Sequence, residues 1–99
     1  MVKHVILWKL KEMDEKETES VKAGIKEGLE GLAGRIPGLV EIHVHTNGLA
    51  GSNADVMLDS TFTDEEALKA YAVNPAHVAV AGGRVRPYTA VRTCLDFTI

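Results

Sequence analysis

The fold of this chain is decided by a short block near its start, KHVILWKL (residues 3–10). Its β-branched and large apolar residues favour a β-strand. Side chains alternate between the two faces of a strand, and one face here carries His4, Ile6, Trp8 and Leu10. The other face carries Val5 and Leu7. Because both faces are largely apolar, we expect this strand to be covered on both sides.

The composition fits one soluble globular domain that spans residues 1–99. Hydrophobic residues make up 45 % of the chain and charged residues 25 %, which excludes intrinsic disorder. The formal net charge is −3, so we expect neither nucleic acid nor an anionic membrane as a partner, since both require a basic surface. Aromatic residues contribute only 5 %, and the core of so small a domain is thin. We therefore expect a further source of apolar burial.

Cysteine usage and the absence of an export signal favour a cytoplasmic protein. Cys94 is the only cysteine, which excludes an intramolecular disulfide and a cysteine-based metal site. Cys94 alternates with the inward-facing residues of its strand, Val91, Thr93, Leu95 and Phe97. Because no base lies nearby in the sequence and there is no CxxC motif, we expect a small packing residue rather than a nucleophile. The apolar stretch from Val5 to Trp8 is too short for a signal-peptide core or a membrane span.

The segment after the first strand predicts a helix that begins at Asp14 and ends at Pro37-Gly38. Asp14 is its N-cap, and Glu17 completes a capping box. A single apolar stripe at helical spacing contains Val21, Ile25, Leu29, Leu32 and Ile36. Beside the stripe lie Gly24, Gly28 and Gly31. They indicate either close approach of the helix backbone to a sheet or tolerated surface positions.

A second, divided helix is expected between Thr63 and Gly82-Gly83. Thr63 is its N-cap and Glu66 completes the capping box. The inward anchors of this helix are Leu68 and Tyr71. Asn74-Pro75 ends it and begins a short second piece, with Asn74 as the cap, until Gly82-Gly83 break that piece.

Three further strands are expected, over residues 39–46, 55–62 and 89–98. In the first of these, alternation directs Val40, Ile42 and Val44 inward. The resulting order is β-α-β-β-α-β. We therefore predict an α+β domain with the ferredoxin-like fold, a four-stranded antiparallel sheet with helices on one face.

Helices on one face leave the opposite face of the sheet uncovered, where we expect Val5, Leu7 and Met57. Large apolar patches mark interaction surfaces. We therefore expect a homodimer in which two sheets pack face to face as a dimeric α/β barrel. The second copy then supplies the burial that the thin core lacks.

Several short motifs follow one another along the whole chain: Val2–Leu10, Ile36–Gly38, Thr61–Phe62, Asp64–Leu68, Tyr71, Asn74–His77 and Asp96–Phe97. In this order and spacing they resemble the stress-responsive dimeric A/B barrel (Dabb) family. The resemblance implies the dimeric barrel. It implies function less narrowly, because members range from stress proteins to a plant polyketide cyclase.

The candidate catalytic residues are His4, Tyr71 and His77, which we expect to converge between sheet and helices. A histidine can abstract a proton near neutral pH, and a tyrosine hydroxyl can hydrogen-bond a carbonyl or an enolate. The resemblance to the plant cyclase implies an aldol-type ring closure with His77 as the base, Tyr71 as its orienting partner and His4 lining the pocket. A structural role, which we favour over catalysis, also explains the trio, because buried polar groups are usually hydrogen-bonded. Val56 and Asn74 stand where the cyclase has histidines, which argues against a polyketide substrate.

The expected ligand-binding residues are Trp8, Val56, Leu58, Arg86 and Tyr88. Arg84, Arg86 and Tyr88 follow the short helix, near the expected mouth of the pocket. Arginine there can hold a carboxylate, although a solvated surface explains the same residues.

Two metal sites are considered. Glu41, His43 and His45 alternate along one strand and could chelate zinc or copper, although an exposed strand face also explains them. The resemblance implies a second site, for Mg or Na, at the backbone carbonyls of Ala33, Ile36 and Leu39, where the first helix ends. No other cofactor is expected.

Two function classes remain open. One is a stress-associated protein that binds a small organic molecule between sheet and helices. The other is a cofactor-free cyclase or lyase that uses His77 and Tyr71 to abstract a proton next to a carbonyl. A flavin- or haem-dependent oxygenase has no supporting motif. The shape of the space around His4, Tyr71 and His77 discriminates between them.

Overall fold

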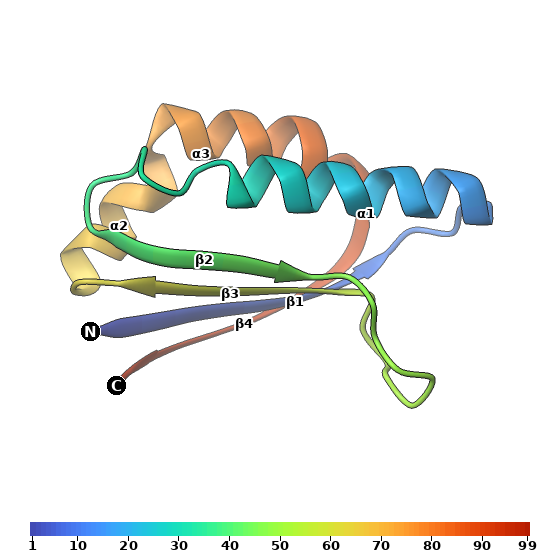
Figure 1. Ribbon diagram of the computed structural model, residues 1–99, viewed down its shortest axis with the longest axis horizontal. Coiled ribbons are helices and arrows are strands. Elements are labelled where there is room, and N and C mark those ends of the chain that lie inside the picture. Colours follow the sequence, from blue (N-terminus) through green and yellow to red (C-terminus); the bar gives the residue numbers. More distant parts are fainter.

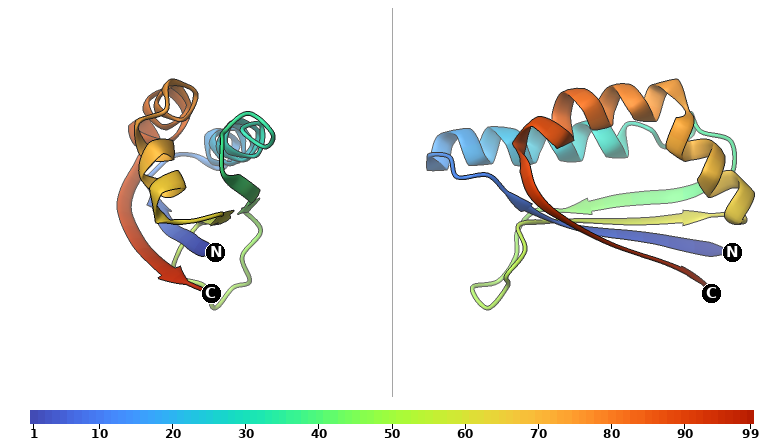
Figure 2. Two further views of the ribbon diagram at one scale, coloured as in Figure 1. Left: turned by 90° about the vertical axis from the view of Figure 1, so that its left-hand side faces the viewer. Right: turned by 180° about the vertical axis from the view of Figure 1, so that it is seen from behind.

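The computed structural model describes residues 1–99 as one sheet and one layer of helices (Figure 1). The strands are β1 (Val2–Leu10), β2 (Leu39–His45), β3 (Val56–Phe62) and β4 (Thr89–Thr98). They pair antiparallel in the order β2-β3-β1-β4. The helices α1 (Glu15–Glu30), α2 (Glu65–Val73) and α3 (Pro75–Val80) all lie on one face of this sheet (Figure 2). The predicted ferredoxin-like α+β fold is confirmed.

The hydrophobic core lies between the sheet and the helix layer. Strand β1 is central in the sheet and alternates as predicted, with its even-numbered residues buried on the helix side. The core cluster includes Ile6, Trp8 and Leu10 from β1 and Val21, Ile25 and Leu29 from α1. Burial of one such side chain contributes roughly 1.5–3 kcal/mol. The stripe on α1 therefore fixes the helix over the centre of the sheet.

Helix α1 begins as predicted and ends earlier. Asp14 Oδ1 accepts a hydrogen bond from the backbone N–H of Glu17 at 2.7 Å. The helix stops at Glu30, and turns continue the chain to β2 while Leu32 and Ile36 stay buried. Gly38 has a φ of 80°, a conformation that favours glycine and turns the chain into the strand.

One glycine of α1, Gly28, marks a contact with α3 and the turn after it, not with the sheet as one sequence interpretation had it. A Cβ atom at Gly28 would lie 2.8 Å from Cδ of Arg84 and 2.9 Å from Cγ1 of Val80. A Cβ atom at Gly24 would meet nothing within 4 Å. Arg84 Nη1 also donates to the carbonyl of Gly24 at 3.2 Å. Only Gly28 is therefore a position of close approach.

The second helix begins one residue later than predicted. Asp64, not Thr63, is the N-cap of α2, and its Oδ1 accepts from the N–H of Ala67 at 2.8 Å. A carboxylate in this place also favours the positive end of the helix dipole. The cap of α3 is the predicted one, since Asn74 Oδ1 accepts from the N–H of Ala76 at 2.9 Å.

Gly82-Gly83 do not break the helix after α3, contrary to the prediction. The chain continues through a π-helical turn (Ala81–Val85) and a 3₁₀ turn (Arg86–Tyr88). Buried Ala81 and Val85 hold this segment against the core, while both glycines face open space. None of the helices combines the length and apolar character that crossing a membrane requires.

The two edges of the sheet differ. At β2, Lys26 Nζ donates to the carbonyl of Val44 at 2.7 Å, and Glu30 accepts from the N–H of Val44 at 2.9 Å. These side chains of α1 satisfy backbone groups of an edge strand. Val40, predicted to point inward, is 51 % exposed because the register shifts between Leu39 and Glu41.

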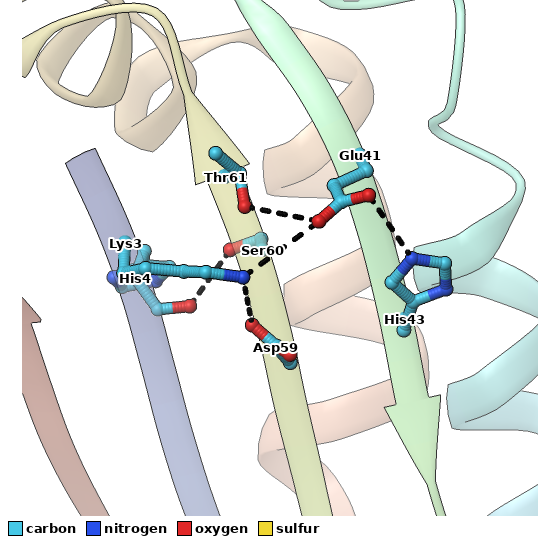
Figure 3. A network of polar contacts seen from close by, with 7 residues as sticks. All are labelled: Lys3, His4, Glu41, His43, Asp59, Ser60 and Thr61. Carbon is cyan, nitrogen blue, oxygen red and sulfur yellow. Dashed lines mark hydrogen bonds and ion pairs between the residues drawn. The ribbon is translucent and has the colours of Figure 1, made fainter. Parts of the chain in front are cut away.

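The sheet face opposite the helices has an apolar part and a polar part. The register places on the apolar part Val5, Leu7, Met57, Val91, Leu95 and Phe97. The apolar residues of β4 therefore face away from the helices, not inward. In the polar part, Lys3 Nζ lies 2.9 Å from Asp59 Oδ1 and 3.7 Å from Glu41 Oε1 (Figure 3).

Candidate functional site

A cavity of about 690 Å³ lies between β1 and β4 on one side and α2 and α3 on the other. This volume is typical of small-molecule pockets, which span roughly 300–1,000 Å³. Strand β4 bends away from the helix layer (Figure 2), and almost its whole length is exposed. Side chains on the helix-facing side of β4 therefore line a cavity instead of a packed core.

The predicted trio of His4, Tyr71 and His77 converges on this cavity, which all three residues line. The Asn74-Pro75 bend between α2 and α3 brings the ring centroids of Tyr71 and His77 to 4.0 Å. The rings of His4 and Tyr71 are 6.1 Å apart, edge to face. Strand β1 and the two consecutive helices α2 and α3 thus supply one cluster of polar aromatic side chains.

Two buried atoms of this trio, the Tyr71 hydroxyl and His77 Nδ1, have no hydrogen-bond partner in the protein. An unsatisfied buried polar group costs about 1–3 kcal/mol. Burial raises the pKa of the Tyr71 hydroxyl to about 12. Burial lowers the pKa of His77 below its ordinary value. At neutral pH the site therefore combines a protonated hydroxyl with a neutral imidazole.

His4 has a carboxylate partner that the sequence did not reveal. This partner is Asp96, which lies opposite His4 in the β1–β4 pairing. His4 Nδ1 and Asp96 Oδ1 form a hydrogen bond. Cys94 lies beside them, with Sγ 3.7 Å from His4 Nδ1 and 3.4 Å from Asp96 Oδ1. Cys94 is exposed on the cavity side, so it is not the packing residue that the sequence predicted.

The predicted ligand-binding residues divide into two groups. Trp8, Leu58 and Arg86 line the cavity. Val56 is buried in the core, and Tyr88 packs against the core as a partly buried side chain. Arg84 reaches α1 and donates to Gly24 instead of facing the cavity.

The metal sites considered from the sequence have different outcomes. Only one trio of His, Cys, Asp or Glu side chains places its ligand atoms within 4.8 Å of one another, and this trio is His4, Cys94 and Asp96. Glu41, His43 and His45 therefore do not converge as a three-ligand site. The magnesium or sodium site at Ala33, Ile36 and Leu39 stays a prediction, and the carbonyl of Ile36 accepts from the N–H of Leu39 at 3.2 Å.

Sequence reasoning missed the contribution of β4, whose helix-facing side chains Arg92, Cys94 and Asp96 line the cavity. The signal was present, because these residues alternate with the apolar Val91, Leu95 and Phe97. We assigned the apolar set to the core, whereas it lies on the open face. The rule that apolar side chains point into the core fails on β4, because its apolar side chains lie on the open face of the sheet and its polar side chains face the cavity.

Comparison with known proteins agrees with the class that these observations define, a ferredoxin-like α+β domain with a cavity between sheet and helices. The sequence matches the model of the stress-responsive A/B barrel domain family (Dabb) over residues 2–99. The chain therefore belongs to the Dabb family. No curated protein matches the sequence.

Solved structures share the fold over nearly the whole chain. A dimeric protein of unknown function with a ferredoxin-like fold from Bacteroides fragilis NCTC 9343 is 31 % identical, with a TM-score of 0.91, and the match covers 99 % of this chain and 95 % of that one. A dimeric ferredoxin-like protein of unknown function from Jannaschia sp. CCS1 is 24 % identical, with a TM-score of 0.80 and coverage of 99 % and 98 %. The hydroxynitrile lyase from Passiflora edulis is 16 % identical, with a TM-score of 0.73 and coverage of 99 % and 92 %, a likeness of fold alone.

Proposed function

We propose that this Dabb protein binds a small organic molecule in the cavity between sheet and helices. The observation that carries the proposal is the pair of unpartnered polar atoms, Tyr71 Oη and His77 Nδ1, on residues that line the cavity. A ligand oxygen that accepts from the Tyr71 hydroxyl, such as a carbonyl oxygen, relieves a cost of about 1–3 kcal/mol that the free protein bears.

The remaining lining indicates the rest of the ligand. Twelve of the residues around the cavity are hydrophobic, including Ile6, Trp8 and Leu68, and they favour an apolar or aromatic body. Arg86 and Arg92 also line the cavity, and neither forms an ion pair with an acidic residue. Arginine recognises carboxylates well. We therefore expect a small apolar ketone or keto acid.

Titration calorimetry with a panel of small ketones, β-keto acids and phenols tests this proposal. The wild-type chain should bind a member of the panel at one site per chain. Tyr71→Phe and His77→Ala should each weaken that binding about tenfold, the value of one hydrogen bond in a desolvated site. His43→Ala, on the opposite face of the sheet, is the matched control and should bind as wild type. Equal affinity in all four proteins contradicts the assignment.

A second candidate is cofactor-free proton abstraction next to a carbonyl. It is favoured by the protonation states at the site, since the raised pKa of Tyr71 keeps a donor for a carbonyl oxygen and the lowered pKa of His77 keeps a base. The Tyr71 hydroxyl forms no hydrogen bond with the His77 side chain, so in this hypothesis the hydroxyl acts on the substrate instead of orienting the base. In this hypothesis His77 takes the proton, and the negative charge that develops on the carbonyl oxygen is stabilised by the Tyr71 hydroxyl.

Turnover of β-keto substrates by the wild type and His77→Ala tests the enzymatic candidate. Loss of turnover in the variant, with the wild-type fold retained by circular dichroism, supports it. His43→Ala should keep full turnover. Equal turnover in wild type and His77→Ala, or none in either, removes His77 from catalysis and leaves the binding function.

We propose further that two copies pair through the uncovered apolar face of the sheet. Leu95 is 65 % exposed, Val91 53 % and Phe97 42 %, so one strand presents to solvent an apolar row that only Thr93 interrupts. Relatives of the same fold are described as dimeric. Light scattering should give a dimer for the wild type and a monomer for Leu95→Glu, while Val73→Glu on α2 stays dimeric. A monomeric wild type at low micromolar concentration contradicts this proposal.

A further inference from the structure

We propose that His4, Cys94 and Asp96 form a binding site for a divalent transition metal of the zinc class. The three side chains stand at the wall of the cavity, and their ligand atoms all lie within 4.8 Å of one another. They offer one imidazole nitrogen, one sulfur and one carboxylate oxygen. The chain contains no other trio of this kind.

Two of the three distances between the ligand atoms are close to those of a tetrahedral site. With a zinc–sulfur bond of about 2.3 Å and zinc–nitrogen and zinc–oxygen bonds of about 2.1 Å, neighbouring ligand atoms lie roughly 3.4–3.6 Å apart. The observed separations are 3.7 Å from Cys94 Sγ to His4 Nδ1 and 3.4 Å from Cys94 Sγ to Asp96 Oδ1. The third edge is the hydrogen bond between His4 and Asp96, which a metal would replace by rotation of the carboxylate.

The same geometry argues against a nucleophilic triad. In such a triad the nucleophile and the carboxylate contact different nitrogens of the histidine, so that a proton passes across the ring. Here Cys94 Sγ and Asp96 Oδ1 both approach Nδ1 of His4. This arrangement does not place the thiol and the carboxylate on different nitrogens of the ring, whereas three ligand atoms that converge on one point suit a cation there.

The backbone holds the ligands in place. Asp96 and Cys94 are alternate residues of β4, so both point to the helix side of the sheet, and β1 pairs His4 directly with Asp96. His4 is 8 % exposed, and its carbonyl accepts a hydrogen bond from Ser60 Oγ at 2.8 Å (Figure 3). The site therefore needs rotation of side chains and no movement of strands.

The donor set selects the metal. Sulfur and imidazole favour zinc, cobalt and copper, whereas magnesium and calcium prefer oxygen ligands alone. A thiolate and a carboxylate together balance the charge of a divalent ion. Three protein ligands leave a fourth tetrahedral position for water or a ligand in the cavity, an arrangement typical of catalytic rather than structural zinc sites. The sequence alone suggested that a single cysteine excludes a cysteine-based metal site. The proposed site removes this restriction, because His4 and Asp96 supply the other two ligands.

Titration of the reduced, untagged protein with Co²⁺ alone tests this site, and it is independent of the organic ligand proposed above. A cysteine thiolate bound to cobalt gives a charge-transfer absorption band. The wild type should develop this band and saturate at one equivalent per chain. Cys94→Ser should abolish the band, and His4→Ala and Asp96→Asn should each weaken cobalt binding at least tenfold. Zinc added in excess should remove the band by displacing cobalt.

The control for adventitious binding is a double variant, His43→Ala with His45→Ala, which removes the histidines of the opposite face. It should keep the band and the stoichiometry. Circular dichroism of Cys94→Ser, a substitution at an exposed position, should show the wild-type fold. Absence of the band in the wild type, or a band that His4→Ala and Asp96→Asn leave unchanged, overturns the proposal. Cobalt binding that disappears in the double variant shows an adventitious surface ion only and overturns it equally.

Discussion

The half of the domain under α1 and the half beside β4 use the same sheet in opposite ways. Under α1, side chains such as Ile25 and Val44 are almost fully buried and fill the space between helix and sheet. Beside β4, the corresponding space is a cavity of about 690 Å³ lined by Arg92, Cys94 and Asp96. The two edge strands differ as well. Side chains of α1 form hydrogen bonds with the backbone of β2, whereas β4 is exposed along almost its whole length.

The comparison separates a half whose packing carries stability from a half in which we propose that the function lies. A sheet buried on one face normally presents apolar residues to its helices. Strand β4 presents a cation, a thiol and a carboxylate instead, and the helices above it contribute two polar atoms without partners. Unsatisfied polar groups lower stability, and such departures from good packing are expected at functional sites.

The largest expected effect is a difference between the two halves in how much a single substitution lowers the free energy of unfolding. Ile25→Ala removes a fully buried side chain of α1 and should lower the free energy of unfolding by about 2–5 kcal/mol. Arg92→Ala, on the cavity side, should change it by less than about 0.5 kcal/mol. Urea denaturation of both variants measures the difference. Similar losses in the two proteins would mean that the cavity half is packed as tightly as the other.

Removal of the unpartnered Tyr71 hydroxyl should raise the stability of the domain and weaken binding of the ligand. Tyr71→Phe keeps the ring, which packs 4.9 Å from the ring of Phe62, and deletes only the unsatisfied group. The free energy of unfolding should rise by about 1 kcal/mol, while affinity for the small-molecule ligand falls. Thermal denaturation and calorimetry measure the two quantities. A loss of stability would show that the hydroxyl has a hydrogen-bond partner in the free protein.

The glycines of α1 offer a matched pair on one helix. Gly24→Ala adds a methyl group where there is open space and should stabilise the domain by about 0.5–1 kcal/mol through helix propensity. Gly28→Ala should lose this gain or reverse it, since the new methyl group meets Arg84 and Val80. The denaturation midpoints of the two variants measure this difference in stability. An equal gain at both positions would show that α1 and α3 are not in close contact.

The smallest expected effect is a dependence of stability on pH. The pKa of His77 is lower in the folded chain than its ordinary value of 6.5. As pH falls below about 6.5, the unfolded chain gains a proton first, so stability declines, and above this pH the group has no effect. Unfolding measured from pH 5 to 7 should show a steeper decline in wild type than in His77→Gln. A shallower decline in wild type would place the pKa shift in the opposite direction.

The periodicity of apolar residues was sufficient to predict the structure of the packed half under α1, but not the lining of the cavity beside β4. The alternation of β1 and the stripe of α1 predicted the fold and the core, because residues such as Ile6 and Ile25 are apolar on one side and meet an apolar partner. The convergence of His4, Tyr71 and His77 was also predicted, since motif order placed them at neighbouring ends of their elements. Asp96 and Cys94 were missed because register between β1 and β4 arises from long-range pairing, which local patterns do not encode.

The central claim is that ligand recognition belongs to the half beside β4, and NMR mapping of backbone amides tests it most directly. The panel of small ketones and β-keto acids is added to the ¹⁵N-labelled chain, and the resonances that move are assigned to residues. We predict shifts confined to β1, β4 and the α2–α3 bend, around His4, Tyr71 and His77, and smaller shifts in Tyr71→Phe at the same ligand concentration. Shifts confined to α1 and β2, or to the open face of the sheet, would contradict the account.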